Sequence, residues 1–122
     1  IGVLAAFGVP RFIKSVERSK AAEAFAFLSG IRAAQERYHA REGTYCADVK
    51  ELDINFSTPK YFTVGEISPG TTGKLEDSWS LTLTRTGASA GYGAYTVTFT
   101  EDGFDTANST IAELTDINPM GT

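Results

Sequence analysis

The chain contains one cysteine, Cys46, and one histidine, His39. A thiol beside an imidazole can act as a nucleophile and its base, but a third group must orient the imidazole. We expect His39 on a helix and Cys46 in the turn after it, and no such third group is in evidence. A single cysteine also excludes a disulfide within the chain, so Cys46 is expected to be a small, half-buried hydrophobic side chain. No catalytic residue is predicted.

Carboxylate oxygens gather in the stretch 101–105, where Asp102 and Asp105 are weak candidates for binding calcium. The spacing of an EF-hand loop is absent, so a solvated turn is the favoured interpretation, and no metal or other cofactor is predicted. The glycine-rich stretch 87–93 lacks the lysine and the strand-to-helix context of a phosphate-binding loop. It predicts a flexible hairpin end. The sequence Asn108-Ser-Thr110 fits the glycosylation pattern, which is expected by chance in a threonine-rich chain.

The charges are divided unevenly along the chain. Residues 1–42 carry seven basic and four acidic side chains, a net charge of +3, whereas residues 43–122 carry four basic and eleven acidic ones, a net charge of −7. A basic rod that bears an acidic head suits self-association. It does not suit a specific nucleic-acid site, which would need a clustered basic face with interleaved aromatic side chains on the head.

One long helix is predicted to carry His39 and most of the basic side chains. It is predicted for residues 11–41, which are rich in alanine, lysine, arginine and glutamate and contain no proline. About 31 residues at 1.5 Å each make a rod of about 46 Å. The helix is expected to end at Arg41 or Glu42, with Gly43 in the left-handed conformation that ends many helices. Such a rod is longer than one compact head covers, so part of it should protrude.

The apolar residues of this helix fall mainly on one stripe, which is the face expected to pack on a head. The members of the stripe are Ile13, Val16, Ala21, Ala24, Phe25, Leu28, Ile31, Ala34 and Tyr38. Phe12 and Phe27 lie off the stripe, so a sheet packed on one side only would leave one of them exposed. The pairs Glu17–Lys20 and Arg32–Glu36 have the spacing of surface ion pairs and are interpreted as a solvated face.

The segment before the rod is apolar but easily unwound. Gly2 and Gly8 each weaken a helix by about 1 kcal/mol, and Pro10 removes the hydrogen bond to the carbonyl of Ala6. As a helix, the nine residues before Pro10 would measure about 14 Å, whereas a bilayer core is about 30 Å thick. Residues 2–10 are therefore the predicted weak point of the rod.

The sequence after the helix predicts a helix-to-sheet loop at 43–59 and an antiparallel sheet with a C-terminal tail at 60–122. Apolar and hydroxyl side chains alternate over 79–84 and 95–100, and another strand is expected at 61–67. One face of the sheet should cover the helix, and the hydroxyl-rich face should meet water.

Shorter signals complete the head. Glu101-Asp-Gly103 predicts a tight hairpin. Ile111, Leu114 and Ile117 predict a tail that adds a short strand or lies along the sheet edge. The predicted core of the head consists of Phe25, Leu28, Ile31, Tyr38, Trp79, Leu81, Leu83, Tyr95, Val97 and Phe99. The fold class is therefore α+β, with a long N-terminal helix packed by its C-terminal half against a small antiparallel sheet.

These features together resemble a type IV pilin or its relative, the pseudopilin of type II secretion systems. The resemblance covers residues 1–46 and is carried by Ile1-Gly-Val-Leu-Ala-Ala6, Pro10, Ala21-Ala-Glu-Ala24, Tyr38 and Glu42-Gly-Thr-Tyr45. It implies an upstream part, not in this sequence, with a glutamate and a processed, methylated first residue. Many pilins close a C-terminal loop with a disulfide, and this chain cannot form one.

The resemblance implies a function and a set of partners. The chain is expected to be a major pilin of an extracellular type IV pilus that serves adhesion, motility or uptake. Its partners would be other copies of itself in a helical polymer, the inner membrane that stores subunits, and the pilus assembly machinery. Residues 1–42 would be the filament-core helix, partly extended from about Gly2 to Val9 in the filament. The expected packing residues are Ile1, Val3, Leu4, Phe7, Val9, Phe12, Ile13 and Val16.

Two alternatives stay open at this point. A secretion pseudopilin has the same architecture and forms a shorter filament that pushes cargo. A soluble ligand-binding or inhibitor-like domain, with a helix wrapped by an antiparallel sheet as in cystatins, would instead be a monomer.

Overall fold

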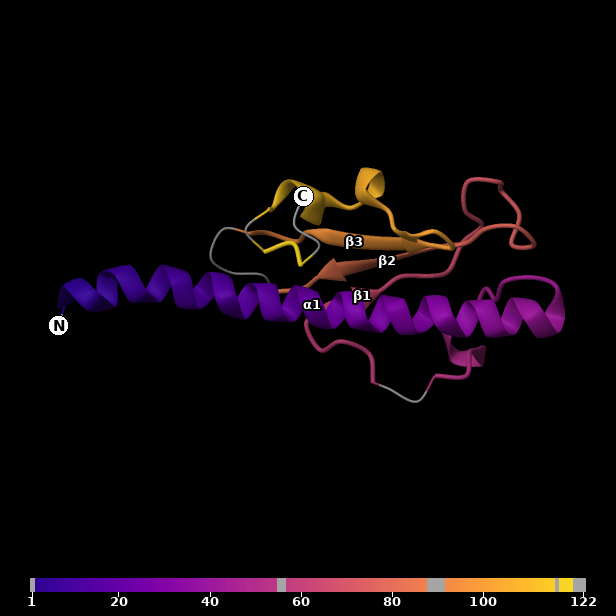
Figure 1. The fold of residues 1–122 in the computed structure, drawn as a ribbon, viewed down its shortest axis with the longest axis horizontal. Coiled ribbons are helices and arrows are strands. Elements are labelled where there is room, and N and C mark those ends of the chain that lie inside the picture. The colour runs from indigo at the N-terminus through magenta and orange to yellow at the C-terminus, as the bar shows by residue number, and fades with distance from the viewer. Residues whose placement is uncertain (1, 55–56, 88–91, 116, 120–122) are drawn as a thin grey trace.

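The computed structural model describes residues 2–54, 57–87, 92–115 and 117–119, and for residues 2–14 it describes the backbone alone (Figure 1). Predictions on Ile1 and on most of the glycine-rich stretch 87–93 lie outside the described residues.

Helix α1 (Gly2–Glu42) contains 41 residues and runs without a break through Pro10. Its predicted end is confirmed, because Gly43 has a φ of 78° and donates its N–H to the carbonyl of His39 at 2.9 Å. The helix also takes in the predicted weak point at residues 2–10, which precedes the run 11–41. A proline deprives one carbonyl of its partner but leaves the other bonds of the preceding turn in place, so the helix continues through it.

In the described part of the chain, four strands form one antiparallel sheet in the order β1-β2-β3-β4. They are β1 (Phe62–Val64), β2 (Ser80–Arg85), β3 (Thr96–Thr100) and β4 (Gly103–Phe104). Leu81 pairs with Phe99 and Leu83 with Val97, so the two central strands turn their apolar side chains to one face. The sheet lies along the C-terminal part of α1 (Figure 1). The predicted α+β class is confirmed.

Strand β1 is shorter than the predicted 61–67. Three residues separate Val64 from Ser68, whereas only two separate their partners Leu83 and Ser80, so one extra residue is accommodated as a bulge. A side chain at Gly65 would come within 2.9 Å of the carbonyl oxygen of Thr82, so the bulge requires glycine there. Alternation of residue types along one strand cannot reveal an extra residue of this kind.

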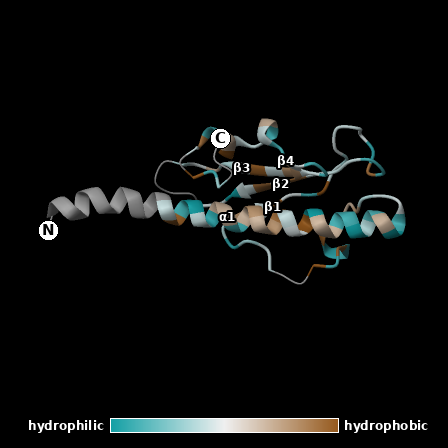
Figure 2. Cartoon of the chain, viewed as in Figure 1, coloured by the Kyte–Doolittle hydropathy of each residue, from teal (hydrophilic) through white to brown (hydrophobic). Residues whose placement is uncertain are grey.

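The core lies between α1 and the apolar face of the sheet. The structure buries Phe25, Leu28, Ile31, Trp79, Leu81, Leu83, Tyr95, Val97 and Phe99, and Tyr38 packs against them partly buried. The ring of Phe25 contacts the rings of Phe99 and Phe104, with centroid distances of 5.8 and 4.9 Å. Figure 2 shows hydrophobic residues along the part of α1 that the sheet accompanies.

Phe27 lies off the stripe that packs on the sheet but is only 3% exposed, so the sheet is not its only cover. The loop after α1 returns on the side of the helix away from the sheet (Figure 1), and Ser57 and Pro59 line a small hollow together with Phe27. The head encloses α1 from two sides.

Two side chains of α1 fasten this loop. The buried amide of Gln35 accepts from the backbone N–H of Cys46 at 2.8 Å and donates to its carbonyl at 2.9 Å. At the surface, Arg37 donates to both carboxylate oxygens of Asp53, at 2.9 and 3.1 Å. Both contacts link the helix to a segment that carries no strand of the sheet.

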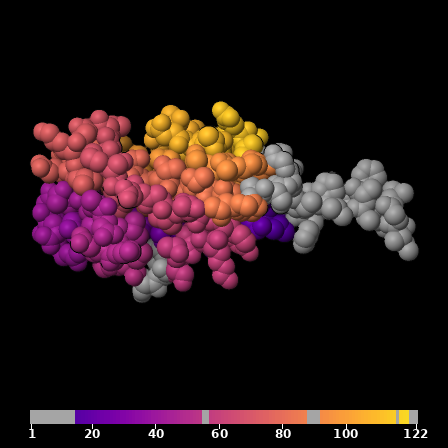
Figure 3. Space-filling model, turned by 180° about the vertical axis from the view of Figure 1, so that it is seen from behind, coloured from indigo at the N-terminus to yellow at the C-terminus, as the bar shows by residue number. Residues whose placement is uncertain are grey.

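The tail lies along the edge of β3, one of its two predicted arrangements, and covers part of the hydroxyl-rich face. Ser109 and Thr110 accept the N–H groups of Thr98 and Thr96 through their hydroxyl oxygens, at 2.8 and 2.7 Å. Figure 3 shows the tail, in yellow, against the orange part of the sheet. Thr98 is consequently 2% exposed, so the expectation that this whole face meets water is wrong.

We predict that Gln35→Ala lowers the free energy of unfolding by about 2–4 kcal/mol, because it strands two backbone groups of Cys46 away from water. Urea unfolding of the full chain in mild detergent measures this loss. Glu23→Ala, at an exposed position of the same helix, is the matched control and should change the free energy by less than about 0.5 kcal/mol. Equal losses in both variants would contradict the structural role of Gln35.

Candidate functional site: the junction of stem and head

The thiol and the imidazole do not form a catalytic pair. The Nε2 atom of His39 lies 2.9 Å from the carbonyl of Glu76, and its ring packs on Tyr45. Cys46 is buried and donates its thiol to the carbonyl of Asp48. Burial raises the pKa of the Cys46 thiol, which keeps it protonated and weakly nucleophilic.

The weak calcium candidates Asp102 and Asp105 each make local contacts. Asp102 is exposed in the turn before β4, and its N–H donates to the hydroxyl of Thr100. The carboxylate of Asp105 accepts from the backbone and side-chain amides of Asn108. Among the described residues, no group of three acidic, histidine or cysteine side chains could hold a metal ion.

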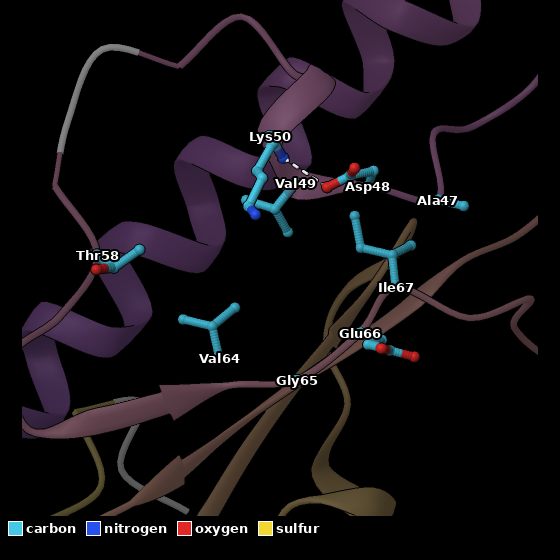
Figure 4. Close-up of a pocket in the computed structure, with 9 residues that line it drawn as sticks. All are labelled: Ala47, Asp48, Val49, Lys50, Thr58, Val64, Gly65, Glu66 and Ile67. Carbon is cyan, nitrogen blue, oxygen red and sulfur yellow. Dashed lines mark hydrogen bonds between the residues drawn. The ribbon is translucent and has the colours of Figure 1, made fainter.

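A groove of about 660 Å³ lies between the loop after α1 and strand β1 (Figure 4). Val49, Val64 and Ile67 are among its apolar lining residues. Its charged groups do not converge on one point, since Figure 4 shows Glu66 directed away from Lys50. A small-molecule site needs apolar walls and a few convergent polar groups, and this groove has only the first.

The arrangement that stands out is at the place where α1 leaves the head. We call residues 2–16 of α1 the stem and the remaining described residues the head; the stem extends beyond the sheet (Figure 1). Glu17 is the first buried residue among the described side chains of α1. It lies on the same helical stripe as Ala21, Ala24 and Leu28, so it points at the sheet.

Glu17 forms a buried ion pair with Arg85. The Nε and Nη2 atoms of Arg85 donate to the two carboxylate oxygens at 2.8 and 3.2 Å, and the hydroxyl of Tyr95 donates to the carboxylate as well. The side chains of Glu17 and Arg85 are only 4% and 2% exposed. The remaining guanidinium nitrogen donates to the backbone carbonyl of Thr86. These contacts pair both buried charges.

The protonation states follow from these contacts. Burial raises the pKa of Glu17, but the hydrogen bonds from Arg85 and Tyr95 and the charge of Arg85 outweigh it, so its pKa lies below the usual value. Burial and the bond to Glu17 raise the pKa of Tyr95. Glu17 is therefore a carboxylate at neutral pH, and Tyr95 keeps the proton that it donates.

This ion pair overturns the interpretation of Glu17 as a solvated charge paired with Lys20. The sequence contained a signal for it, because Arg85 continues the alternation of Leu81 and Leu83 on the apolar face of β2. A charge at such a position requires a buried partner. The partner lies 68 positions away in the chain, beyond the reach of a local pattern.

The structure describes little of the predicted filament-core residues. Of these, only Val16 has a described side chain, which is 36% exposed. The positions Gly2, Gly8 and Pro10 are helical in this single chain. No helix among the described residues is both long enough and apolar enough to span a membrane.

The fold and this junction define a class of protein: a subunit whose helix continues past its own head. A family model described as pilin, of bacterial filaments, matches residues 17–113. The chain therefore belongs to the pilin family and is a structural subunit of a bacterial filament. Comparisons with curated proteins and with solved structures find no match.

We predict that Glu17→Gln lowers the free energy of unfolding at pH 7 by about 3–5 kcal/mol, because Arg85 stays buried without its counterion. Glu23→Gln is the exposed control on the same helix. The triple variant Glu17→Leu, Arg85→Met, Tyr95→Phe should recover most of the loss, since it leaves no buried charge. Urea unfolding of the full chain in detergent measures all three.

The same variants carry a pH signature. The stability contributed by Glu17 is present above the pKa of an unfolded glutamate, about 4.3, and is lost as the pH falls through the lower pKa of the folded protein. The parent chain should therefore lose stability on acidification more steeply than Glu17→Gln. Parallel acid curves for the two proteins would refute the ion pair.

Proposed function

We propose that this chain is the major pilin of an extracellular type IV pilus. The observation that carries the proposal is the stem, which continues α1 beyond the sheet (Figure 1). Its sequence is predominantly apolar up to Val9. A helix with apolar residues all round needs cover from other molecules, and copies of the same chain can supply it.

The free energy available from burying the apolar side chains of the stem is sufficient to hold a filament together. Burying one large apolar side chain is worth about 1.5–3 kcal/mol. The predicted packing residues from Ile1 to Val16 would together contribute on the order of 10 kcal/mol or more before the entropy of association is subtracted. Contacts of this kind hold a non-covalent polymer and remain reversible, which permits storage of subunits in the inner membrane and their assembly and withdrawal by a pilus machinery.

Symmetry favours a filament over a closed pair. A stem differs from the surfaces of the head beside it, so contacts between stem and neighbour are heterologous. Heterologous contacts that do not close into a ring generate a helical polymer. The filament itself requires no catalytic group.

We predict that purified full-length chain forms long fibres on removal of detergent and that Val9→Asp abolishes them, because a charge would be buried among the stems. Ala107→Asp, at an exposed position of the tail, should leave assembly intact. Electron microscopy and sedimentation measure the outcome. Dispersed single molecules in plain buffer would contradict the proposal, whereas short fibres and a melting temperature raised by calcium would favour the secretion pseudopilin.

We also predict that the backbone of residues 2–9 is partly extended in the assembled filament, since Gly2, Gly8 and Pro10 weaken the helix there. Pro10→Ala should lengthen the ordered helix in the filament. Image reconstruction of parent and variant filaments measures the difference. An unbroken helix through the stem of the parent filament would contradict this prediction.

A further inference from the structure

Two large hydrophobic side chains are exposed among the described residues, and both lie at the junction. They are Val16, 36% exposed, and Tyr61, 40% exposed. Lys20 connects them, because it lies one turn after Val16 on the same side of α1 and its Nζ atom sits 4.4 Å from the centroid of the Tyr61 ring. We call Val16, Lys20 and Tyr61 the collar.

Tyr61 is held in place by its surroundings. The guanidinium carbon of Arg85 lies 5.3 Å from the ring centroid, so the ring contacts a second cation, the one already fixed by Glu17. The carbonyl of Tyr61 accepts from the N–H and the hydroxyl of Thr86, at 2.9 and 3.1 Å. A partly exposed aromatic side chain held in one position loses little entropy on binding, as interface anchors do.

The collar is basic, and Lys20 contacts the ring of Tyr61 but forms no ion pair within the described part of the chain. The ion pairs described there engage Arg37 and Arg85 and leave Lys20 and the neighbouring Arg18 without a carboxylate within 4.0 Å. Residues 43–122, which make up most of the head, carry four basic and eleven acidic side chains. The head of another copy therefore offers the complementary sign of charge.

We propose that the collar is the surface on which the head of a second copy docks in the filament. The neighbour's carboxylates face Lys20, and its apolar atoms pack on Tyr61 and Val16. A second copy is the occupant because the collar borders the stem, and copies that surround the stem must lie beside it. This inference rests on the proposed function.

The ion pair of Glu17 with Arg85 also holds the collar in position. Arg85 contacts both Glu17 on the helix and the ring of Tyr61, so the contact that fixes where α1 leaves the head also fixes the anchor of the collar. The angle between stem and head and the position of the neighbour are thereby set together.

Two substitutions of the full chain test the collar through the lowest subunit concentration that gives fibres on removal of detergent. Lys20→Glu and Tyr61→Ser are each expected to raise this concentration about tenfold, because each variant loses one good interface contact. Lys74→Glu makes the same charge change at an exposed residue next to Leu75, beside the end of α1, and should leave it unchanged. Tyr61→Phe keeps the ring and should match the parent.

A second measurement does not depend on how the variants fold. Val16→Cys should react with a maleimide at least about tenfold more slowly in fibres than in detergent-dispersed subunits, whereas Lys74→Cys should react equally in both. Cys46 is buried, and labelling of the parent chain measures the background reaction of its thiol.

The outcomes separate the two proposals. If the parent chain forms no fibres, the proposed function fails and the collar fails with it. If fibres form, equal assembly of the parent, Lys20→Glu and Tyr61→Ser overturns the collar alone, because slower labelling of Val16→Cys also follows from packing of the stem.

Discussion

The mismatch in length between α1 and its sheet governs the whole molecule. A helix of 41 residues measures about 60 Å, whereas the longest strand has six residues and measures about 20 Å. The loop 43–59 and the tail enlarge the head, but both are used along the same part of the helix, where they cover Phe27 and the edge of β3. The chain thus concentrates its cover on the C-terminal part of α1, and the helix continues past that cover as the stem (Figure 1).

The boundary between covered and uncovered helix is set by charge as well as by packing. A purely apolar interface between α1 and the sheet would tolerate some sliding, since hydrophobic contact is non-directional. The ion pair of Glu17 with Arg85 does not tolerate it, because a shift by one helical turn would separate two buried charges. Buried pairs of this kind often add little net stability, because the desolvation of both ions opposes their attraction. Their value here is positional: they fix one arrangement of stem and head.

The sequence predicted the features that depend on neighbouring residues. The predictions failed where a segment distant in the chain determines the environment of a side chain. Gly43 ends the helix as predicted, and alternation located the strands that became β2 and β3, because capping and pleating are properties of neighbouring residues. The interpretation of Glu17 as a surface charge failed because its spacing to Lys20 was taken as sufficient, although Arg85 competes for it from β2. The position of Phe27 predicted that a sheet on one side would not cover it, but not which segment does, since the loop that covers it has no periodic pattern.

The two lines of evidence for the family come from different ends of the chain. The resemblance rests on residues 1–46, whereas the family match begins at Glu17 and extends through the head to residue 113. They share residues 17–46, while the resemblance adds residues 1–16 and the family match adds the rest of the head. A continuous helix also cannot bend back to bury its own stem in its own head. In the filament proposed above, other copies of the chain cover this stem, and because every copy carries the same stem, assembly continues from copy to copy.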